Sequence, residues 1–272
     1  MTAFELKARA YAKALDWGVP RLRRIAIRNL ELAGFADPAR ITDGVFLTVG
    51  RIMASVASFP SITRANVHEW IRYDGLENFT AAQAKGRGVL VATAHLGNWE
   101  LSAFTHALMT APMHIVVRPL DNARVNAFIE KRRALSGNHI IQKTDAARKI
   151  LKALSGGQAV GILIDQNTTP AEGVFIDFFG RKACAGTAFV KFAHHTGAAV
   201  VPGYALWSDE EKKYILRFDP EIPMTGDVQG NVQEDTQRVH TALERVIRAH
   251  PDQWLWIHRR WKTRPPGEPG LY

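Results

Sequence analysis

Apolar runs alternate with amphipathic stretches along most of the chain, and this alternation indicates its elements. Short runs rich in β-branched residues, such as 89–94 and 159–164, predict buried strands. Stretches with an apolar residue at every third or fourth position, such as 98–109, predict helices. The predicted strands are 70–74, 89–94, 113–117, 140–141, 159–164, 199–206 and 214–218, with 222–224 as a candidate for a last one. The predicted helices are 3–16, 21–30, 42–57, 76–85, 98–109, 122–135, 145–155, 186–196 and 231–249.

Strands that alternate with helices of about 10–15 residues favour parallel pairing with right-handed crossovers. We therefore expect an α/β fold of three layers, a mostly parallel sheet flanked by helices, with an N-terminal helical segment. The expected division is a helical membrane-surface segment at 1–66 and an α/β domain at 67–272. Between the third core strand and the next helix, 168–185 contains Pro170, Gly173 and Gly180 and is predicted to be a loop.

The stretch 88–100 places polar side chains where a buried strand turns into a helix. His95 follows the strand, Asn98 is a candidate helix cap, and Glu100 falls in the first helical turn. The carboxyl ends of strands in an open α/β sheet are where ligands bind. A carboxylate five residues after the histidine can orient the imidazole through one ring nitrogen, which leaves the other free to accept a proton. By itself, a histidine at this place is more often a structural hydrogen-bonding group than a catalytic one.

Polar residues also follow two further strands of the predicted sheet. Arg118 follows the strand at 113–117, and Asp165, Gln166 and Asn167 follow the strand at 159–164. Carboxyl ends of parallel strands meet at one edge, so these groups can converge with His95 on a single cleft. An arginine there is suited to hold a phosphate or carboxylate, although a salt bridge is an equally good interpretation of Arg118 alone.

Charge and composition limit the partners without selecting one. The 272 residues carry 35 Lys and Arg against 26 Asp and Glu, a formal charge of +9, and 46% are hydrophobic. This surplus attracts nucleic acid, anionic membranes or an acidic carrier protein. We find no secretory signal and no uninterrupted apolar run of ~18 residues, so we expect no spanning helix. The amphipathic 3–16 and arginine-rich 21–30 segments fit a helix pair on a membrane surface as well as ordinary packed helices.

Several common catalytic motifs are absent from the sequence. The chain has no G-x-S-x-G, no G-x-x-x-x-G-K-[ST], no G-x-G-x-x-G and no H-E-x-x-H. We therefore expect no serine-hydrolase elbow, no common nucleotide loop and no bound metal. The single cysteine, Cys184, excludes an internal disulfide, and its small neighbours indicate a packing role rather than a nucleophile.

Aromatic and basic residues alternate in the terminal stretch 254–262. Trp254, Trp256 and Trp261 are interleaved with Arg259, Arg260 and Lys262. This pattern fits a membrane interface or a surface on which nucleic-acid bases stack. It fits equally a closing strand with buried indoles and a solvated basic edge.

Taken together, these strings resemble the bacterial lipid A biosynthesis acyltransferases, the lauroyl and myristoyl branch of the glycerolipid acyltransferase superfamily. The resemblance runs in order through residues 85–265. The strings that carry it are TAHLGNWE (93–100), VRP (117–119), DQN (165–167), FFG (178–180) leading to GT (186–187), VVP (200–202) and WLWIHRRWKTR (254–264). Family members commonly begin with a membrane-spanning anchor, which we do not identify in this chain.

The resemblance implies a mechanism and a set of site residues. His95 would be the general base that removes the proton of an acceptor hydroxyl, and Glu100 would orient and stabilise the imidazolium. Backbone N–H groups near Gly97 and Asn98 would stabilise the oxyanion. The implied substrate-binding residues are Asn98, Arg118, Asp165, Gln166, Asn167 and Thr187.

The implied substrates are a fatty acyl thioester, carried by acyl carrier protein or coenzyme A, and an amphiphilic lipid acceptor. We expect no further cofactor, no metal and no nucleic acid. Acyl carrier protein is the favoured donor, and the place of action is an anionic membrane surface, at the cytoplasmic face of the inner membrane. The first hypothesis is O-acylation of a lipid A precursor. The second is the same chemistry on another glycolipid or amino-lipid, and the third is a basic module that binds RNA or membrane without catalysis.

Overall fold

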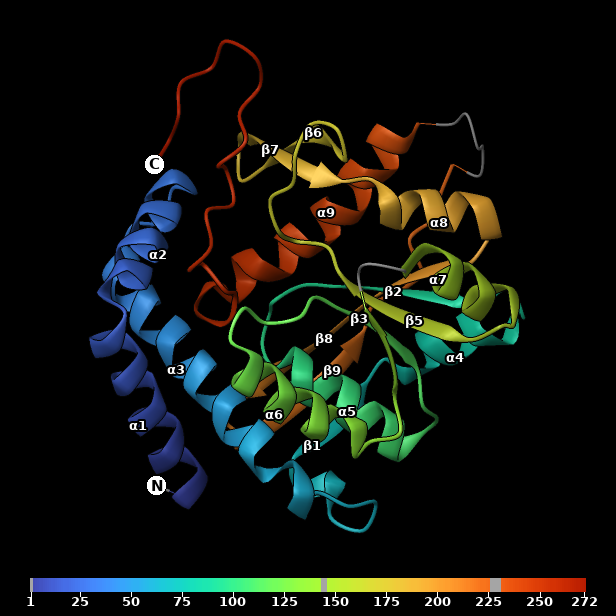
Figure 1. Cartoon of the computed structure of the whole chain (residues 1–272), viewed down its shortest axis with the longest axis horizontal. Coiled ribbons are helices and arrows are strands. Elements are labelled where there is room, and N and C mark those ends of the chain that lie inside the picture. The colour runs from blue at the N-terminus through green and yellow to red at the C-terminus, as the bar shows by residue number, and fades with distance from the viewer. Residues whose placement is uncertain (1, 143–145, 226–230) are drawn as a thin grey trace.

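A seven-stranded sheet forms the centre of the molecule, as the alternation of strands and helices predicts (Figure 1). The computed structural model describes residues 2–142, 146–225 and 231–272. The strand order is β1-β9-β8-β2-β5-β3-β4, and every neighbouring pair is parallel except the antiparallel β8 and β9. The strands are β1 (Ile71–Asp74), β2 (Val89–Thr93), β3 (His114–Val117), β4 (His139–Gln142), β5 (Ala159–Leu163), β8 (Ala199–Ser208) and β9 (Lys213–Phe218).

Helices cover both faces of this sheet, which gives the expected three layers. Side chains of β2 alternate, because Val89 and Val91 pack with α4 and α5 whereas Leu90 and Ala92 pack with α7, α8 and α9. Strands buried on both faces explain why the central runs are continuously apolar. The helices of these two layers are α4 (Leu76–Ala84), α5 (Trp99–Met109), α6 (Ala123–Ala134), α7 (Ala146–Ser155), α8 (Ala188–Thr196) and α9 (Val232–Ala249). Residue 145, where the predicted 145–155 helix begins, lies outside the described residues.

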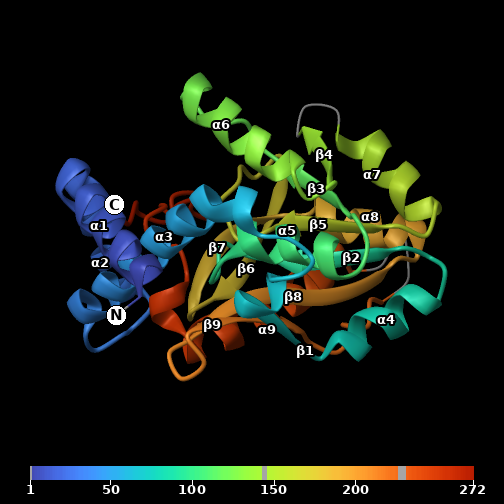
Figure 2. The ribbon, with the colours of Figure 1, turned by 90° about the horizontal axis from the view of Figure 1, so that it is seen from below.

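Three helices precede the sheet and gather at one end of the molecule, opposite α4 and α7 (Figures 1 and 2). They are α1 (Ala3–Gly18), α2 (Pro20–Leu32) and α3 (Pro38–Ser58), followed by the short turns η1 (Phe59–Ser61) and η2 (Val67–Glu69). Helices α1 and α3 approach closely, since a Cβ on Gly50 would lie 2.1 Å from the carbonyl oxygen of Ala8. Ile52, Val56 and Phe59 share a core with the sheet.

One of these helices also has the length and hydropathy of a membrane span. Residues Pro38–Ser61 form a continuous 24-residue helical stretch with a mean hydropathy of 1.2 in its most apolar window. Of that window, 56% is buried inside the protein. The sequence alone predicts no spanning helix, whereas this stretch meets the criteria of length and composition for one.

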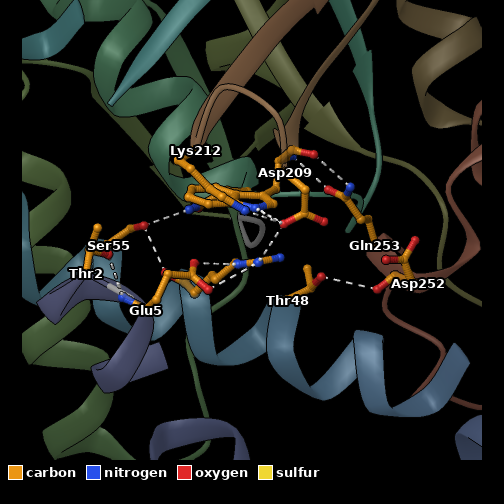
Figure 3. Close-up of polar contacts among 11 residues, drawn as sticks. Thr2, Glu5, Thr48, Ser55, Asp209, Lys212, Asp252 and Gln253 are labelled. Carbon is orange, nitrogen blue, oxygen red and sulfur yellow. Dashed lines mark hydrogen bonds and ion pairs between the residues drawn. The ribbon is translucent and has the colours of Figure 1, made fainter. Parts of the chain in front are cut away.

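A network of polar contacts attaches the N-terminal helices to the α/β body (Figure 3). Arg51 on α3 pairs with Glu5 on α1 at 3.1 Å and with Asp209, which follows β8, at 3.5 Å. Its guanidinium also stacks over the Trp207 ring, 4.4 Å from the ring centre. About one turn before Arg51 on α3, the Thr48 hydroxyl donates to the carbonyl of Asp252. The N-terminal helices therefore contact both the sheet edge and the C-terminal part of the chain.

The predicted loop at 168–185 is the main error in the predicted elements. This stretch contains an antiparallel hairpin, β6 (Gly173–Phe178) and β7 (Arg181–Gly186), which forms a separate two-stranded sheet. Its turn places Phe179 and Gly180 at positive φ. The second strand is built from small residues that carry no strong strand signal, and tertiary burial stabilises it instead. Cys184 is fully buried there, in the packing role expected of it.

The candidate strand at 222–224 is reduced to a single bridge between Val200 and Ile222.

A histidine buried beneath the sheet leads to a prediction about stability and pH. Burial lowers the pKa of His106 to about 4, and its ring nitrogens contact the hydroxyls of Tyr73 (2.7 Å) and Thr110 (3.1 Å). Between pH 6.5 and 4 the unfolded chain binds a proton at this position that the folded protein does not, so stability decreases as the pH falls. For a shift of this size, the free energy of unfolding should decrease by about 3 kcal/mol.

Urea unfolding at several pH values measures this effect. His106→Asn retains a hydrogen-bonding group near Tyr73 but cannot titrate, so its stability should depend less on pH over the same range. The dependence should not vanish, because burial also lowers the pKa of His240 and of His258 to about 4. An unchanged pH dependence in His106→Asn would contradict this account.

Candidate active site

The register of two neighbouring strands brings His95 and Asp165 together. Strands β2 and β5 are parallel, with Thr93 opposite Leu163, so the residues two positions further along each strand lie side by side. Asp165 Oδ1 lies 2.9 Å from the His95 ring nitrogen Nδ1, and Asp165 Oδ2 accepts a hydrogen bond from the His95 backbone N–H at 2.9 Å. We call these two residues the His95–Asp165 pair.

A tryptophan from the C-terminal part of the chain completes the surroundings of the carboxylate. The Trp254 indole N–H donates to Asp165 Oδ2 at 2.8 Å, and the backbone N–H of Leu255 donates to the carbonyl of His95 at 2.9 Å. Trp254 also forms a bridge with Leu96. The segment after α9 (Val232–Ala249) therefore runs along the turn that carries His95 and holds that turn in place through these contacts.

The electrostatics of the His95–Asp165 pair favour a charged carboxylate. Burial alone would raise the pKa of Asp165, but the charge of His95 and the hydrogen bonds from it outweigh burial and hold that pKa well below its usual range. A proton on Nδ1 that points at this carboxylate leaves Nε2 as a hydrogen-bond acceptor. The His95 side chain is 16% exposed, and no hydrogen bond to its Nε2 is found within the described residues. The arrangement can therefore take a proton from a group that approaches Nε2.

Glu100, which was expected to orient His95, lies in a different environment. It forms a two-point ion pair with Arg133 of α6, with the Arg133 Nε 2.8 Å from Oε2. Arg133 is itself mostly buried, and its pKa is raised because the charge and hydrogen bonds of Glu100 outweigh the effect of burial. The expected His95–Glu100 contact is thus corrected to His95–Asp165. The cause is the turn into α5, which directs the first helical residues toward α6.

The N–H groups expected to stabilise an oxyanion are already engaged within the protein. The Gly97 N–H donates to the carbonyl of Gln253 at 2.7 Å, and the Asn98 N–H donates to that of Ala205 at 2.8 Å. Gly97 has a φ of +60°, and a Cβ there would meet the Ala205 oxygen at 1.8 Å, so only glycine fits this turn. The oxyanion prediction for these two groups is therefore wrong, because the turn uses them to join β8 and the C-terminal segment.

Asn98 and Thr187 have structural contacts in place of the expected substrate contacts. Asn98 is fully buried, caps α5 by accepting from the Leu101 N–H at 3.0 Å, and donates to the Ser55 hydroxyl at 2.9 Å. Thr187 is also buried, and its hydroxyl donates to the carbonyl of Glu172 at 3.3 Å. Asn98 is thus the predicted helix cap, and both residues belong to the scaffold of the site.

The remaining predicted residues lie at the same edge of the sheet, with differing exposure. Arg118 follows β3, the neighbour of β5, but its side chain is 75% exposed and pairs with Asp121 at 3.5 Å. Gln166 and Asn167 line a cavity of about 510 Å³ next to Asp165. Asn167 is held there by two hydrogen bonds with Thr263, at 2.9 and 3.1 Å.

The C-terminal tryptophans and Arg260 are interior groups. Trp254, Trp256 and Trp261 are fully buried, as is Arg260, whose guanidinium donates to the carbonyl of Cys184 at 2.8 Å. Burial excludes a membrane or nucleic-acid surface role for these four residues and confirms the alternative of buried indoles. The strand and the solvated basic edge of that alternative are wrong, because 254–262 forms no strand and Arg260 is buried. Sequence reasoning missed the contact of Trp254 with Asp165, because the repeated Trp and Arg pattern does not distinguish a surface from a core.

A histidine from the same segment lies beside the pair. The His258 Nδ1 contacts the carbonyl of Leu255 at 2.8 Å, and its ring centre is 5.3 Å from that of Trp254. Its Nε2 is buried and has no hydrogen-bond partner within the described part of the chain. Burial lowers the pKa of His258 to about 4, so the ring is neutral near pH 7.

Comparison with known proteins shows the family to which the chain belongs. Residues 8–263 match the family described as bacterial lipid A biosynthesis acyltransferase. The lipid A biosynthesis palmitoleoyltransferase of Escherichia coli (strain K12) is 28% identical over 260 residues, which are 93% of this chain and 82% of the relative. The lipid A biosynthesis lauroyltransferase of the same organism is 28% identical over 208 residues, which are 76% of this chain and 66% of the relative. A phosphatidylinositol mannoside acyltransferase of Mycobacterium tuberculosis (strain ATCC 25618 / H37Rv) is 25% identical over 269 residues, covering 95% and 81%.

The α/β fold and the family match over almost the whole chain define an acyltransferase. More particularly, the chain belongs to the bacterial lipid A biosynthesis acyltransferase family. The expectation of an enzyme is therefore confirmed over that of a non-catalytic binding module.

Proposed function

We propose that this protein moves a fatty acyl chain from a thioester to a hydroxyl of a lipid A precursor, with His95 as general base. The observation that carries the proposal is the imidazole itself: Asp165 holds Nδ1, and Nε2 has no partner among the described residues. Nε2 takes the proton of the acceptor hydroxyl as its oxygen bonds to the acyl carbon. The carbon–sulfur bond then breaks, and the same nitrogen returns the proton to the leaving thiolate.

Asp165 orients the imidazole in this mechanism and stabilises its charged form. The reaction needs no acyl-enzyme intermediate, because the acceptor oxygen is itself the nucleophile. The fully buried Cys184, in contact with Arg260, is not placed as an alternative nucleophile. A base positioned in this way contributes about 10²–10⁴-fold to the rate.

The net charge of the protein and its exposed apolar residues support a proposal for the acyl donor and for the cellular location. The formal charge of +9 suits an acidic acyl carrier protein and an anionic lipid surface. At the junction of α1 and α2, Trp17 is 85% exposed and Val19 is also exposed, with Arg21 next to them. Such a group of aromatic, aliphatic and basic side chains suits the interface of a bilayer. We assign the protein to the cytoplasmic face of the inner membrane, with residues 1–66 as its membrane-surface segment and 67–272 as its catalytic part.

The test is an assay of acyl transfer with purified protein. Acyl carrier protein and coenzyme A thioesters are each offered with a lipid A precursor, and mass spectrometry should find one additional ester-linked acyl chain. Failure of the wild-type protein to acylate any lipid with either donor would overturn the proposal. Hydroxylamine-sensitive acylated protein, formed from the thioester alone, would contradict direct attack by the acceptor.

A second candidate acceptor is another glycolipid, which the similarity to a phosphatidylinositol mannoside acyltransferase favours. The same assay with a phosphoglycolipid in place of the lipid A precursor distinguishes the two. Lipid extracts of a deletion strain, read by mass for a missing acyl chain, give the answer in the cell.

A further inference from the structure

Cationic side chains line two adjoining cavities between α2 (Pro20–Leu32) and the C-terminal segment. The first cavity, of about 260 Å³, is lined by Arg21, Arg24, Arg28 and Arg259. The second, of about 510 Å³, shares Arg21 and Arg259 with the first and adds Lys262. The end of the chain lies beside α2 (Figure 1), and its last residue, Tyr272, lines the first cavity.

Protein carboxylates leave most of this positive charge unneutralised. Arg21, Arg24 and Arg259 form no ion pair with any described carboxylate. Arg28 lies 3.6 Å from the carboxylate of Glu31 and donates through Nε to the carbonyl of Leu271 at 3.1 Å. The contrast with Arg23 is informative, because this neighbour on α2 pairs with Asp16 and Asp43 at 2.7 and 2.8 Å. Helix α2 thus directs one arginine to acidic partners and presents three to the first cavity.

Two buried nitrogen atoms in these walls also lack partners. The Arg259 Nε is buried and unbonded within the described residues, and so is the His258 Nε2 of the larger cavity. The Arg259 Nε is a donor, whereas the His258 Nε2 is an acceptor, because the Nδ1 of the neutral ring donates to the carbonyl of Leu255. A buried polar atom without a partner costs free energy of folding, and a ligand that brings an anionic oxygen to Arg259 and a hydroxyl to His258 satisfies both.

The larger cavity lies next to the catalytic groups. Gln166 and Asn167 on its wall follow Asp165 directly in the chain. From the other side, His258 on the same wall contacts Trp254, the tryptophan that donates to Asp165. A substrate bound among the arginines would therefore lie close to the His95–Asp165 pair, beside the Gln166 side-chain amide, which suits a sugar hydroxyl.

We propose that the arginine-lined cavities form a subsite for a phosphate group of the lipid acceptor, an inference that rests on the acyltransferase function proposed above. Arginine binds phosphate through paired, charge-assisted hydrogen bonds, and several arginines around one hollow select a group with more than one negative charge. The acceptor is favoured over the donor because Val19, Leu22 and Ile25 line the larger cavity near the exposed Trp17, the part of the surface proposed above to contact the bilayer. A lipid whose acyl chains remain in a bilayer can place its headgroup in the arginine-lined cavities.

The test compares Arg21→Gln/Arg24→Gln with wild type, using a lipid A precursor with its phosphates and the same lipid after phosphatase treatment. Both arginines are exposed and unpaired within the described residues, so the fold should be kept. The matched control, Lys152→Gln/Lys191→Gln, removes two charges from α7 and α8 at the far end of the molecule (Figure 1). Loss of two charge-assisted contacts should raise KM for the phosphorylated lipid about tenfold or more.

The other kinetic values separate the possible sources of the phosphate. In the arginine variant, kcat and the KM for the thioester donor should stay near wild type, as should activity on the dephosphorylated lipid. The control variant should match wild type throughout. A raised KM for the donor alone would overturn the proposal and assign the arginines to the phosphate of the donor, and equal KM values for the phosphorylated lipid in all three proteins would also overturn it.

Equilibrium binding of the same two lipids in detergent micelles separates this proposal from the catalytic one. Tight binding of only the phosphorylated lipid by wild type, lost in Arg21→Gln/Arg24→Gln, supports the subsite even if no acyl transfer occurs. Equal binding of both lipids by wild type would contradict it, even if transfer is fast.

Discussion

Replacing His95 by alanine should reduce acyl transfer by about 10²–10⁴-fold, the usual contribution of a positioned general base. The change removes the only group of the His95–Asp165 pair that faces the substrate side. The fold should persist, because the His95 backbone N–H still donates to Asp165 and its carbonyl still accepts from Leu255. The rate is measured with a saturating thioester donor and the lipid A precursor, and circular dichroism reports the fold.

His195→Ala is the matched control for this variant. His195 is an exposed histidine on α8 and should be replaceable without loss of rate. Full transfer activity in His95→Ala would end the proposed mechanism, because the acceptor proton would then not go to His95.

Asp165→Asn should impair catalysis much more than Glu100→Gln, although sequence spacing alone assigns the orienting role to Glu100. The Asp165 carboxylate accepts from the His95 N–H and the Trp254 indole and faces the His95 Nδ1. An amide has one oxygen and would direct its own N–H groups at these donors, so the imidazole loses its orientation and its counter-charge. We expect kcat to fall about 10²–10⁴-fold, comparable to the loss of an orienting carboxylate in a catalytic triad.

Glu100→Gln gives the contrasting result. This change leaves the His95–Asp165 pair intact but deprives the mostly buried Arg133 of its charge partner. Its main effect should be lower stability, seen as a lower urea midpoint, with a smaller loss of kcat at a temperature where the variant is folded. A greater loss of kcat in folded Glu100→Gln than in Asp165→Asn would restore Glu100 as the orienting residue.

Trp254→Phe tests the role of the Asp165 carboxylate in a second way, which serves if Asp165→Asn does not fold. It removes one hydrogen bond to the carboxylate but preserves aromatic packing, and should lower kcat with little change in KM. An unchanged kcat would show that the carboxylate does not depend on this contact.

The local sequence determined most of the elements, though not the hairpin of β6 and β7, and it singled out the turns that carry the candidate site residues. Buried strands, such as 89–94 and 159–164, are apolar on both faces, so their periodicity and length are visible without tertiary information. The cap at Asn98 is similarly local, because a side chain binds a backbone N–H three residues away. Polar groups after each strand indicated the correct edge of the sheet, since a parallel sheet gathers its carboxyl ends.

Tertiary structure alone decided which of these groups touch. Asp165 is 70 residues from His95, and only the pairing of β2 with β5 places it on the imidazole. Glu100 is five residues away but on a helix that turns toward Arg133. The tryptophans at 254, 256 and 261 read as interfacial by pattern, yet all three are buried, because amphipathic composition is the same whether a segment faces lipid or a protein core. Side-chain contacts between distant segments depend on register and burial, and neither is encoded in the spacing of residues along one segment.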